Sequence, residues 1–473
     1  MNDFLKKMAG FSIGPIGGAL LAFITIPLTT HFVVPAEYGK AGMFTLIQTM
    51  AVTFLYLGID QAYTREFHET GDPLRLFQNA LLVPLTVSAF LLALLCFRAQ
   101  EFSRLIFGQP DELPAVFLLA IMLLFMIVER FLLLSIRMQE KAFAYSFFSI
   151  LVKLVILVAT LFFVLMIRRD FLAVVYSTAL GQICGDLYLM GRYRQYLDFR
   201  RFQIDRPLIK RLLIFGLPIV VAASASSFLN ASGRLALRTW SSFYEIGIFT
   251  ATLKISAVLS IIQTSFTNFW VPTAYRWQSE GKEMRYFKKV SDSLLLAMTI
   301  LFFLVLIFKQ LIVFVLSPSY ASAVYSLGFL CLQPVMYTVS ETTTLGIVFS
   351  RKSYLNIWVS LISLLPGMLL CGLLVPPYGA MGAAAATGVS YLFFFWSRSF
   401  FSNKNWSGFP LIRHYTVMLL LFAAACINAF PVRFIVLLNL GMLLVTLMVQ
   451  RGTLKALYTR FHSKRLDQPS AFQ

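Results

Sequence analysis

The chain has 473 residues, of which 59% are hydrophobic and 13% are charged, and its formal net charge is +19. A soluble globular protein is nearer half apolar and a quarter charged, so this composition excludes an ordinary soluble domain and predicts a chain surrounded mostly by lipid. The cysteines occur singly in apolar runs, which is typical of small core residues and not of a metal or redox motif: Cys96, Cys184, Cys331, Cys371 and Cys426.

Fourteen apolar segments approach the length of about 20 residues that a helix needs to cross a bilayer. The first six cover residues 9–33, 41–62, 76–97, 113–134, 142–166 and 171–191. The next six cover 212–233, 247–271, 292–315, 321–348, 354–375 and 379–399, and a last pair covers 411–430 and 433–450. The prediction is an all-α polytopic membrane protein.

The basic residues are distributed unequally between the two sets of loops. With the N-terminus inside, and with cations near the approximate span ends counted with the adjoining loops, 28 of the 40 Lys and Arg lie at the termini or in even-numbered loops and eight lie in odd-numbered loops. The four inside spans are Arg130, Lys153, Arg234 and Lys254. Enrichment on one side follows the positive-inside rule and predicts that both termini are cytoplasmic. The large net charge is therefore explained by topology and anionic lipid, and we expect no nucleic-acid partner.

The chain repeats itself after about 205–210 residues. FSIGP at 11–15 corresponds to FGLP at 215–218, and Glu37-Tyr38-Gly39 corresponds to Glu245-Ile246-Gly247. The repeats predict two pseudo-symmetric six-helix lobes related by an axis along the membrane normal, an arrangement that puts a transporter's substrate site between its halves. The expected parts are an N-terminal lobe (1–191), a cytoplasmic linker (192–211), a C-terminal lobe (212–402), the last pair of helices (403–451) and a cytoplasmic tail (452–473).

A polar strip marks the seventh span. Counting in fours from Pro218 gives Ala222, Ser226, Asn230 and Arg234, which share one face of a helix. Lys254 follows about seven residues into the next span. A cation in the bilayer costs about 2.5–3.5 kcal/mol on insertion scales, so the two residues predict one wall of a water-filled passage.

Five further charged residues lie in or near predicted spans: Glu129, Arg130, Lys153, Asp186 and Glu341. Each carboxylate is a candidate for H⁺ or Na⁺ coupling, because it can alternate between charged and neutral states, and each is equally able to neutralise a neighbouring cation. Glu129 is also a candidate partner of Lys153, and Arg130 a candidate member of an interfacial ion pair. The dispersed histidines show no metal spacing, and no catalytic motif occurs, so no metal, other cofactor or enzymatic site is expected.

The N-terminal region carries the pattern Pro-x-Glu-Tyr-Gly, then Leu-Gly-Ile-Asp, then an arginine, in Pro35, Glu37, Tyr38, Gly39, Leu57, Gly58, Asp60 and Arg65. FGLPIVV at 215–221, YEIGIFTATLKIS at 244–256 and PPYGAMGAAAATGVSY at 376–391 follow in order. This series resembles the Wzx-type polysaccharide and O-antigen flippases of the multidrug/oligosaccharidyl-lipid/polysaccharide exporter (MOP) superfamily. The resemblance covers most of residues 9–400.

The resemblance implies a flippase of the bacterial inner membrane that moves an undecaprenyl-pyrophosphate-linked oligosaccharide to the outer leaflet by alternating access. The implied partners are this lipid-linked substrate, membrane lipids and the polysaccharide polymerase and assembly proteins. Lys153, Arg234 and Lys254, with Asn230 and Arg130, would then bind the pyrophosphate and glycan. The chain departs from the family pattern at one position. The family commonly has Asp-Arg near the end of the seventh span, and this chain has Gly233-Arg234.

Three alternatives remain open from the sequence. A drug or cation antiporter of the same superfamily should have an acidic cavity, against which the intramembrane cations count. A lipid II flippase shares the fourteen spans and a cationic cavity, and the Pro-x-Glu-Tyr-Gly motif at the start of the second span favours the polysaccharide branch over it. A membrane polymerase or ligase would need a sizeable outside loop, and no predicted outside loop exceeds about 20 residues.

Overall fold

The computed structural model describes residues 2–67, 69–350, 352 and 354–466, which form helices and connecting loops with no strand among them. The all-α class is therefore confirmed. The chain divides into two compact units, of which unit 1 comprises Met1–Lys254 and Leu316–Tyr320, and unit 2 comprises Ile255–Val315 and Ala321–Gln473. The predicted lobe boundaries rest on sequence repetition and remain a prediction.

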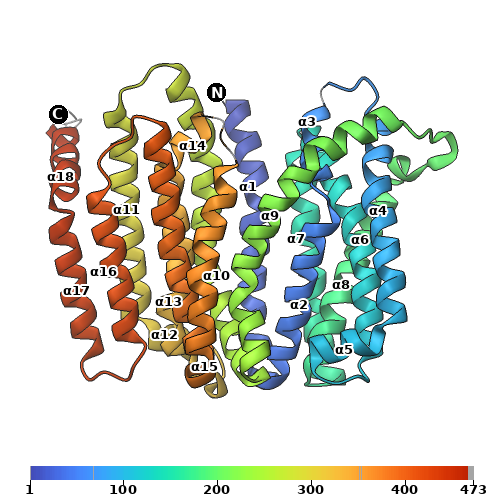
Figure 1. Ribbon diagram of the computed structural model, residues 1–473, viewed down its shortest axis with the longest axis horizontal. Helices are drawn as coiled ribbons and strands as arrows, with labels where there is room; N and C mark the ends of the chain where they lie inside the picture. Colours follow the sequence, from blue (N-terminus) through green and yellow to red (C-terminus); the bar gives the residue numbers. More distant parts are fainter. Residues whose placement is uncertain (1, 68, 351, 353, 467–473) are drawn as a thin grey trace, which may run out of the picture. The chain divides into compact units, whose positions relative to one another are not determined.

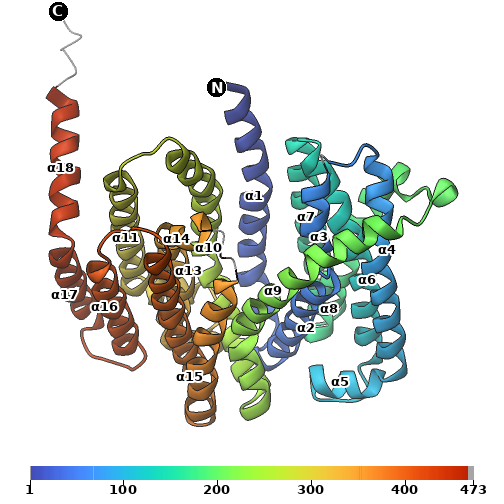
Figure 2. The same ribbon diagram turned by 45° about the horizontal axis from the view of Figure 1, so that its top comes forward.

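Unit 1 contains ten α-helices or parts of them and four shorter helical turns (Figure 1). They are α1 (Asn2–Phe32), α2 (Pro35–Leu55), α3 (Ile59–Glu66), α4 (Pro73–Phe97), α5 (Ala99–Phe107), α6 (Leu113–Met138), α7 (Ala142–Phe162), η1 (Phe163–Ile167), α8 (Phe171–Arg192), η2 (Arg194–Leu197), η3 (Phe199–Arg201), α9 (Arg206–Trp240), the first part of α10 (Phe243–Ser279) and η4 (Pro318–Tyr320). Helix α1 packs on α7, α6 and α7 pack on α8, and α2 and α3 pack on α9. Figure 2 shows α5 lying across the directions of α4 and α6.

Unit 2 contains the rest of α10 and eight further helices, two of which are short. They are α11 (Met284–Ile307), α12 (Lys309–Phe314), α13 (Ala323–Thr343), α14 (Leu345–Phe349), α15 (Leu355–Asn405), α16 (Ile412–Asn428), α17 (Ile435–Val449) and α18 (Arg451–Leu466). Helix α13 packs on α15, and α11 packs on both α13 and α17. Trp270 and Phe287 are fully buried at the centre of an aromatic core that also includes Trp277, Phe349 and Trp406.

Nine helices among the described residues are long and apolar enough to cross a membrane, or ten if α2 and α3, which are bent by 49°, form one span. One of them, α15, has 51 residues and breaks at Gly379 (φ 50°, ψ −126°), so it covers both the eleventh and twelfth predicted spans. Three shorter apolar helices, Ile16–Phe32, Ile412–Asn428 and Ile435–Val449, coincide with the first and the last two. The chain is a multi-pass membrane protein, and the number of fourteen spans stays a prediction.

Aspartates and prolines define where several of these helices begin. Asp72, Asp170 and Asp205 precede α4, α8 and α9, and the side chain of each accepts a hydrogen bond from a backbone N–H of the first turn. Proline stands at the start of α2 and α4, where its missing N–H has no helical partner to lose. These local signals fix the ends of the helices that carry the candidate sites.

Two glycines at equivalent positions of the repeats, Gly39 on α2 and Gly247 on α10, each lie against the backbone of the other's helix in unit 1. A methyl group on Gly39 would come within 1.9 Å of the Phe243 carbonyl oxygen, and one on Gly247 would come within 1.9 Å of the Pro35 carbonyl oxygen. Pro35 and Phe243 precede the two glycines by the same four residues, so this glycine contact is reciprocal, as expected around a two-fold axis. Gly42 extends it, because a methyl group there would meet the Thr250 hydroxyl oxygen at 2.6 Å.

The bend between α2 and α3 is fixed by a second pair of glycines. Leu57 and Gly58 both have positive φ (50° and 65°), and a methyl group on Gly58 would meet the Gly216 carbonyl oxygen at 2.2 Å. Gly216 belongs to α9, so the Leu-Gly-Ile-Asp and Phe-Gly-Leu-Pro motifs touch each other. Only glycine combines the left-handed conformation with so close an approach.

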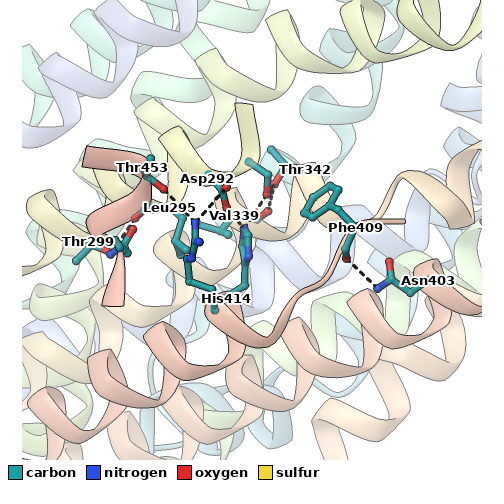
Figure 3. Close-up of polar contacts among 12 residues, drawn as sticks. Asp292, Leu295, Thr299, Val339, Thr342, Asn403, Phe409, His414 and Thr453 are labelled. Atoms are coloured by element: carbon teal, nitrogen blue, oxygen red, sulfur yellow. Dashed lines mark hydrogen bonds and ion pairs between the residues drawn. The ribbon is translucent and has the colours of Figure 1, made fainter. Parts of the chain in front are cut away.

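A buried polar network joins α11, α13, α16 and α18 in unit 2 (Figure 3). The Ser291 hydroxyl lies 2.8 Å from His414 Nε2 and 2.7 Å from the Thr342 hydroxyl. Arg413 Nη1 lies 3.2 Å from both Asp292 Oδ2 and the Thr453 hydroxyl. These bonds hold the start of α16 against α11, α13 and α18.

Candidate functional site

A polar cavity of about 340 Å³ lies in unit 1 between α2 and α9. Four of its lining residues belong to α2 and six to α9: Leu46, Thr49, Met50, Thr53, Ala223, Ser226, Ser227, Asn230, Ala231 and Arg234. Ser226, Asn230 and Arg234 are the last three residues of the strip predicted from the sequence, spaced four apart on one face of α9. The lining contains one cation and no acidic residue.

Arg234 has an unused hydrogen-bond donor in this cavity. Its Nε atom is buried and has no hydrogen-bond partner among the described residues. The hydroxyls of Thr49, Thr53 and Ser226 instead donate to carbonyls four residues earlier in their own helices. A guanidinium with an unused N–H is suited to an anionic ligand rich in oxygen, such as a phosphate.

Lys254, the second predicted cation, lies close to the glycine contact and does not line the cavity. Its Nζ stands 4.9 Å from the centre of the Tyr38 ring, a cation–π contact. The Tyr38 ring packs edge-on against Tyr320, whose hydroxyl donates to the Val33 carbonyl oxygen at 2.7 Å. The contacts therefore connect Lys254, on α10, to the N-terminal end of α2 and to η4.

Lys153 is exposed on α7, and its charge acts on Glu129 and Asp186. These two carboxylates both accept a hydrogen bond from Gln182 Nε2, each at 2.9 Å. The structure therefore brings Lys153, Glu129 and Asp186 into one cluster between α6, α7 and α8. This cluster shares no residue with the cavity that contains Arg234 and Asn230.

Arg130 and Glu341 have partners that differ from those considered in the sequence. Arg130 Nη2 lies 2.7 Å from Asp60 Oδ2, so its ion pair is with α3. Glu341 Oε1 lies 2.9 Å from Arg398 Nη1 in unit 2, and both side chains are almost buried. The Arg398 guanidinium also lies over the rings of Tyr337 and Phe394, at 5.2 and 5.4 Å.

Several residues of these sites escaped the sequence interpretation. Thr49 and Thr53 form the opposite wall of the cavity, and only their spacing of four on an apolar helix could have marked them. Gln182 precedes Asp186 by four residues, which indicates a shared face but not the bond to Glu129. No group of three or more His, Cys, Asp or Glu side chains that could hold a metal ion occurs in the part of the chain that the structure describes.

The fold is that of membrane transporters of the MOP superfamily. The structure is similar to a lipid II flippase, MurJ, in an inward closed conformation, with a TM-score of 0.70, 12% identity, and coverage of 95% of this chain and 99% of that one. It is also similar to an outward-facing multidrug resistance MATE family transporter of the MOP superfamily, with a TM-score of 0.58, 15% identity, and coverage of 84% and 95%. A search of curated proteins finds no match.

The chain belongs to the polysaccharide biosynthesis protein family, whose model matches residues 4–278 of its 473 residues. The resemblance to polysaccharide flippases is thereby confirmed at the level of the family. The family is thus one of polysaccharide biosynthesis proteins, and the fold is one that known membrane flippases and transporters share.

Proposed function

We propose that this protein moves an undecaprenyl-pyrophosphate-linked oligosaccharide, the repeat unit of a surface polysaccharide, from the cytoplasmic to the outer leaflet of a bacterial inner membrane. The observation that carries the proposal is the α2–α9 cavity, in which Arg234 presents a buried and unpartnered Nε–H. A pyrophosphate is a compact anion with several acceptor oxygens. Asn230, beside Arg234 in the lining, supplies a further polar group for its oxygens.

The charge distribution supports the orientation of the protein in the membrane. With 28 of 40 Lys and Arg at the termini and in even-numbered loops, both termini lie in the cytoplasm. The glycine contact between the starts of α2 and α10 then lies at the outer side. An alternating-access cycle requires that the outer side opens to release the cargo, and in this orientation the glycine contact lies on that side.

The polarity of the cavity also bears on the alternatives. A transporter of cationic drugs would expose them to the Arg234 guanidinium in a lining without a carboxylate, which is electrostatically unfavourable. A lipid II flippase handles a cargo with the same pyrophosphate and is the second candidate, favoured by the similarity of fold to a lipid II flippase. If the cargo is a polysaccharide repeat unit, a polymerase would act on it after translocation, and the polymerase is therefore a proposed partner.

The test is to delete the gene and to measure the lipid-linked oligosaccharide that accumulates on the inner leaflet. Wild-type protein should restore the normal distribution, Arg234→Ala should not, and Arg234→Lys should restore it in part. Lys210→Ala is the matched control, because Lys210 is an exposed cation near the start of the same helix. Accumulation of lipid II instead of a polysaccharide unit would select the second candidate, and an altered drug tolerance with normal polysaccharide would contradict both.

A further inference from the structure

An apolar groove of about 540 Å³ lies on unit 2, between the start of α16 and the two limbs of α15 that meet at the Gly379 break. Its volume is within the range of about 300–1,000 Å³ that is usual for small-molecule sites. One lining residue belongs to the first limb and one to α16, and the second limb contributes four aromatic rings: Ile362, Tyr415, Phe393, Trp396, Phe400 and Phe401. The groove shares no residue with the α2–α9 cavity.

The second limb of α15 continues the groove toward a lysine. Trp396, Phe400 and Lys404 are spaced four residues apart, so they lie on one side of the helix. The centre of the Trp396 ring lies 6.0 Å from that of Phe393 and 6.3 Å from that of Tyr415. Lys404 is exposed in the last turn of α15. An aromatic groove therefore has a cation at one end.

Lys352 brings a second positive charge to the same end of the groove. It precedes α15, and its Nζ atom donates a hydrogen bond of 2.8 Å to Asn405 Oδ1. Asn405 directly follows Lys404, and the side chains of both lysines are exposed. Two like charges held near each other repel, and an anion between them would relieve the repulsion.

The surrounding sequence supplies no acid for these two lysines. Residues 342–466 contain eleven Lys and Arg and no Asp or Glu. Arg413 in this stretch pairs with Asp292 of α11, whereas neither Lys352 nor Lys404 forms an ion pair with a described residue. Their charge is thus available to an anion from outside the chain.

The aromatic surface and the charge together indicate the chemistry of the ligand. In a bilayer an apolar groove selects nothing by hydrophobicity alone, because lipid tails are as apolar as its walls. Basic residues at the membrane surface attract anionic headgroups and so distinguish one lipid from another. A phospholipid with a net negative headgroup matches both features, since its acyl chain suits the rings and its phosphate suits the lysines.

We propose that the α15–α16 groove binds an anionic phospholipid of the phosphatidylglycerol type. One acyl chain lies along Trp396 and Phe400, and the phosphate lies at Lys404 and Lys352. In the orientation proposed above, this lipid belongs to the inner leaflet. The inference does not depend on the identity of the transported cargo.

The experiment uses purified full-length protein in phosphatidylcholine nanodiscs that contain a small fraction of brominated lipid and no lipid-linked sugar. Bromine on an acyl chain quenches the fluorescence of an indole that it contacts, so the difference between wild type and Trp396→Phe reports the lipid at Trp396. Brominated phosphatidylglycerol is compared with brominated phosphatidylcholine. The test variant is Lys404→Gln, and the matched control is Lys455→Gln, which removes an exposed cation of α18; each is measured with and without Trp396→Phe.

We expect brominated phosphatidylglycerol to quench the Trp396 component at a lipid fraction at least about fivefold lower than brominated phosphatidylcholine requires. Lys404→Gln should reduce this preference about fivefold, which corresponds to losing one basic residue at the membrane surface. Lys455→Gln should keep it. Equal quenching by the two lipids in wild type, or an unchanged preference in Lys404→Gln, would overturn the proposal.

Two other occupants of the groove have their own signatures in this assay. Undecaprenyl phosphate, added without a sugar, should not displace brominated phosphatidylglycerol from Trp396, and displacement would assign the groove to the tail of a polyprenyl lipid. A second copy of the chain would shield Trp396 from both brominated lipids and double the mass of the particle's protein. Either result would contradict a phospholipid site, and neither measurement involves transport of the cargo.

Discussion

Intramembrane arginines in this chain differ in whether a carboxylate faces them. Arg130 is paired with Asp60 and Arg398 with Glu341. Arg234 has no ion pair among the described residues, and its Nε is unpartnered in a polar cavity. An arginine whose charge is compensated within the protein holds helices together, whereas an uncompensated one is available to a ligand.

The paired arginine of unit 2 gives a prediction about stability. Arg398→Met should destabilise the protein by about 3–5 kcal/mol, because it leaves Glu341 as an unpaired buried charge. Glu341→Gln should have a similar effect for the converse reason. The double variant should recover much of the loss, since both charges are then absent.

Thermal or denaturant unfolding in detergent measures these differences as a double-mutant cycle. The same cycle on the exposed pair Arg285 and Glu283 is the control and should give a coupling of at most about 1 kcal/mol. Additive losses at Arg398 and Glu341 would show that the two side chains stabilise the fold independently.

Helix pairs in unit 1 approach each other through small residues at repeated positions. The glycine contact of Gly39 and Gly247 joins α2 to α10, and Gly58 meets Gly216 where α2 bends into α3. Small residues allow helix backbones to touch in a membrane, where apolar side chains alone provide no driving force. The close packing at this symmetric contact therefore depends on the absence of side chains, and one added methyl group should disturb it.

Gly39→Ala should loosen the proposed outer end, because the new methyl group would overlap the Phe243 carbonyl oxygen. We expect faster hydrogen exchange over residues 35–45 and 243–250, and a loss of stability of about 1–3 kcal/mol. Gly191→Ala is the control, since a methyl group there meets no atom within 4 Å. Unchanged exchange in Gly39→Ala would mean that the starts of α2 and α10 are not in contact in the membrane.

Local periodicity made part of this architecture predictable. The spacing of Ser226, Asn230 and Arg234 depends on one helix alone, so the sequence placed all three on one face, and the structure puts them in one cavity. The opposite wall, with Thr49 and Thr53, depends on how two distant helices meet, and single-sequence patterns do not contain that information. The pairing of Glu341 with Arg398 escaped prediction for the same reason.

The internal repeat of the sequence predicted a further part of the fold, but not all of it. It marked Gly39 and Gly247 as equivalent positions but did not indicate that they touch. Likewise, the 51-residue helix α15 was predicted as two spans, and the break at Gly379 agrees with that division. The equivalence of two repeat positions can be seen in the sequence. Whether the two residues touch depends on where the symmetry axis passes through the fold, which the sequence does not give.

Across the whole molecule, the loops at one end of the lipid-surrounded helices carry more positive charge than the loops at the other end. The linker at 192–211 contains seven Lys and Arg, and the loop between α5 and α6 contains none. This asymmetry predicts opposite sides of the membrane for the two segments.

Cysteine labelling in intact cells tests the orientation. In a cysteine-free background, Gln109→Cys should react with a membrane-impermeant thiol reagent added outside, and Arg200→Cys should react only after the membrane is opened. A fluorescent protein fused after residue 473 should fold and emit, since it would lie in the cytoplasm. Labelling of Arg200→Cys from outside would invert the proposed topology and with it the direction of transport.

The central claim, that Arg234 engages the pyrophosphate of a lipid-linked oligosaccharide during translocation, is tested most directly in proteoliposomes. Purified protein is reconstituted with fluorescent undecaprenyl-pyrophosphate oligosaccharide, and arrival in the opposite leaflet is read by quenching with an impermeant lectin. We predict rapid translocation by wild type and by Lys210→Ala, and a rate about 10–100-fold lower for Arg234→Ala, as expected for losing a charge-assisted hydrogen bond of about 1.5–3 kcal/mol. Equal rates for wild type and Arg234→Ala, or no translocation by wild type above empty vesicles, would contradict the claim.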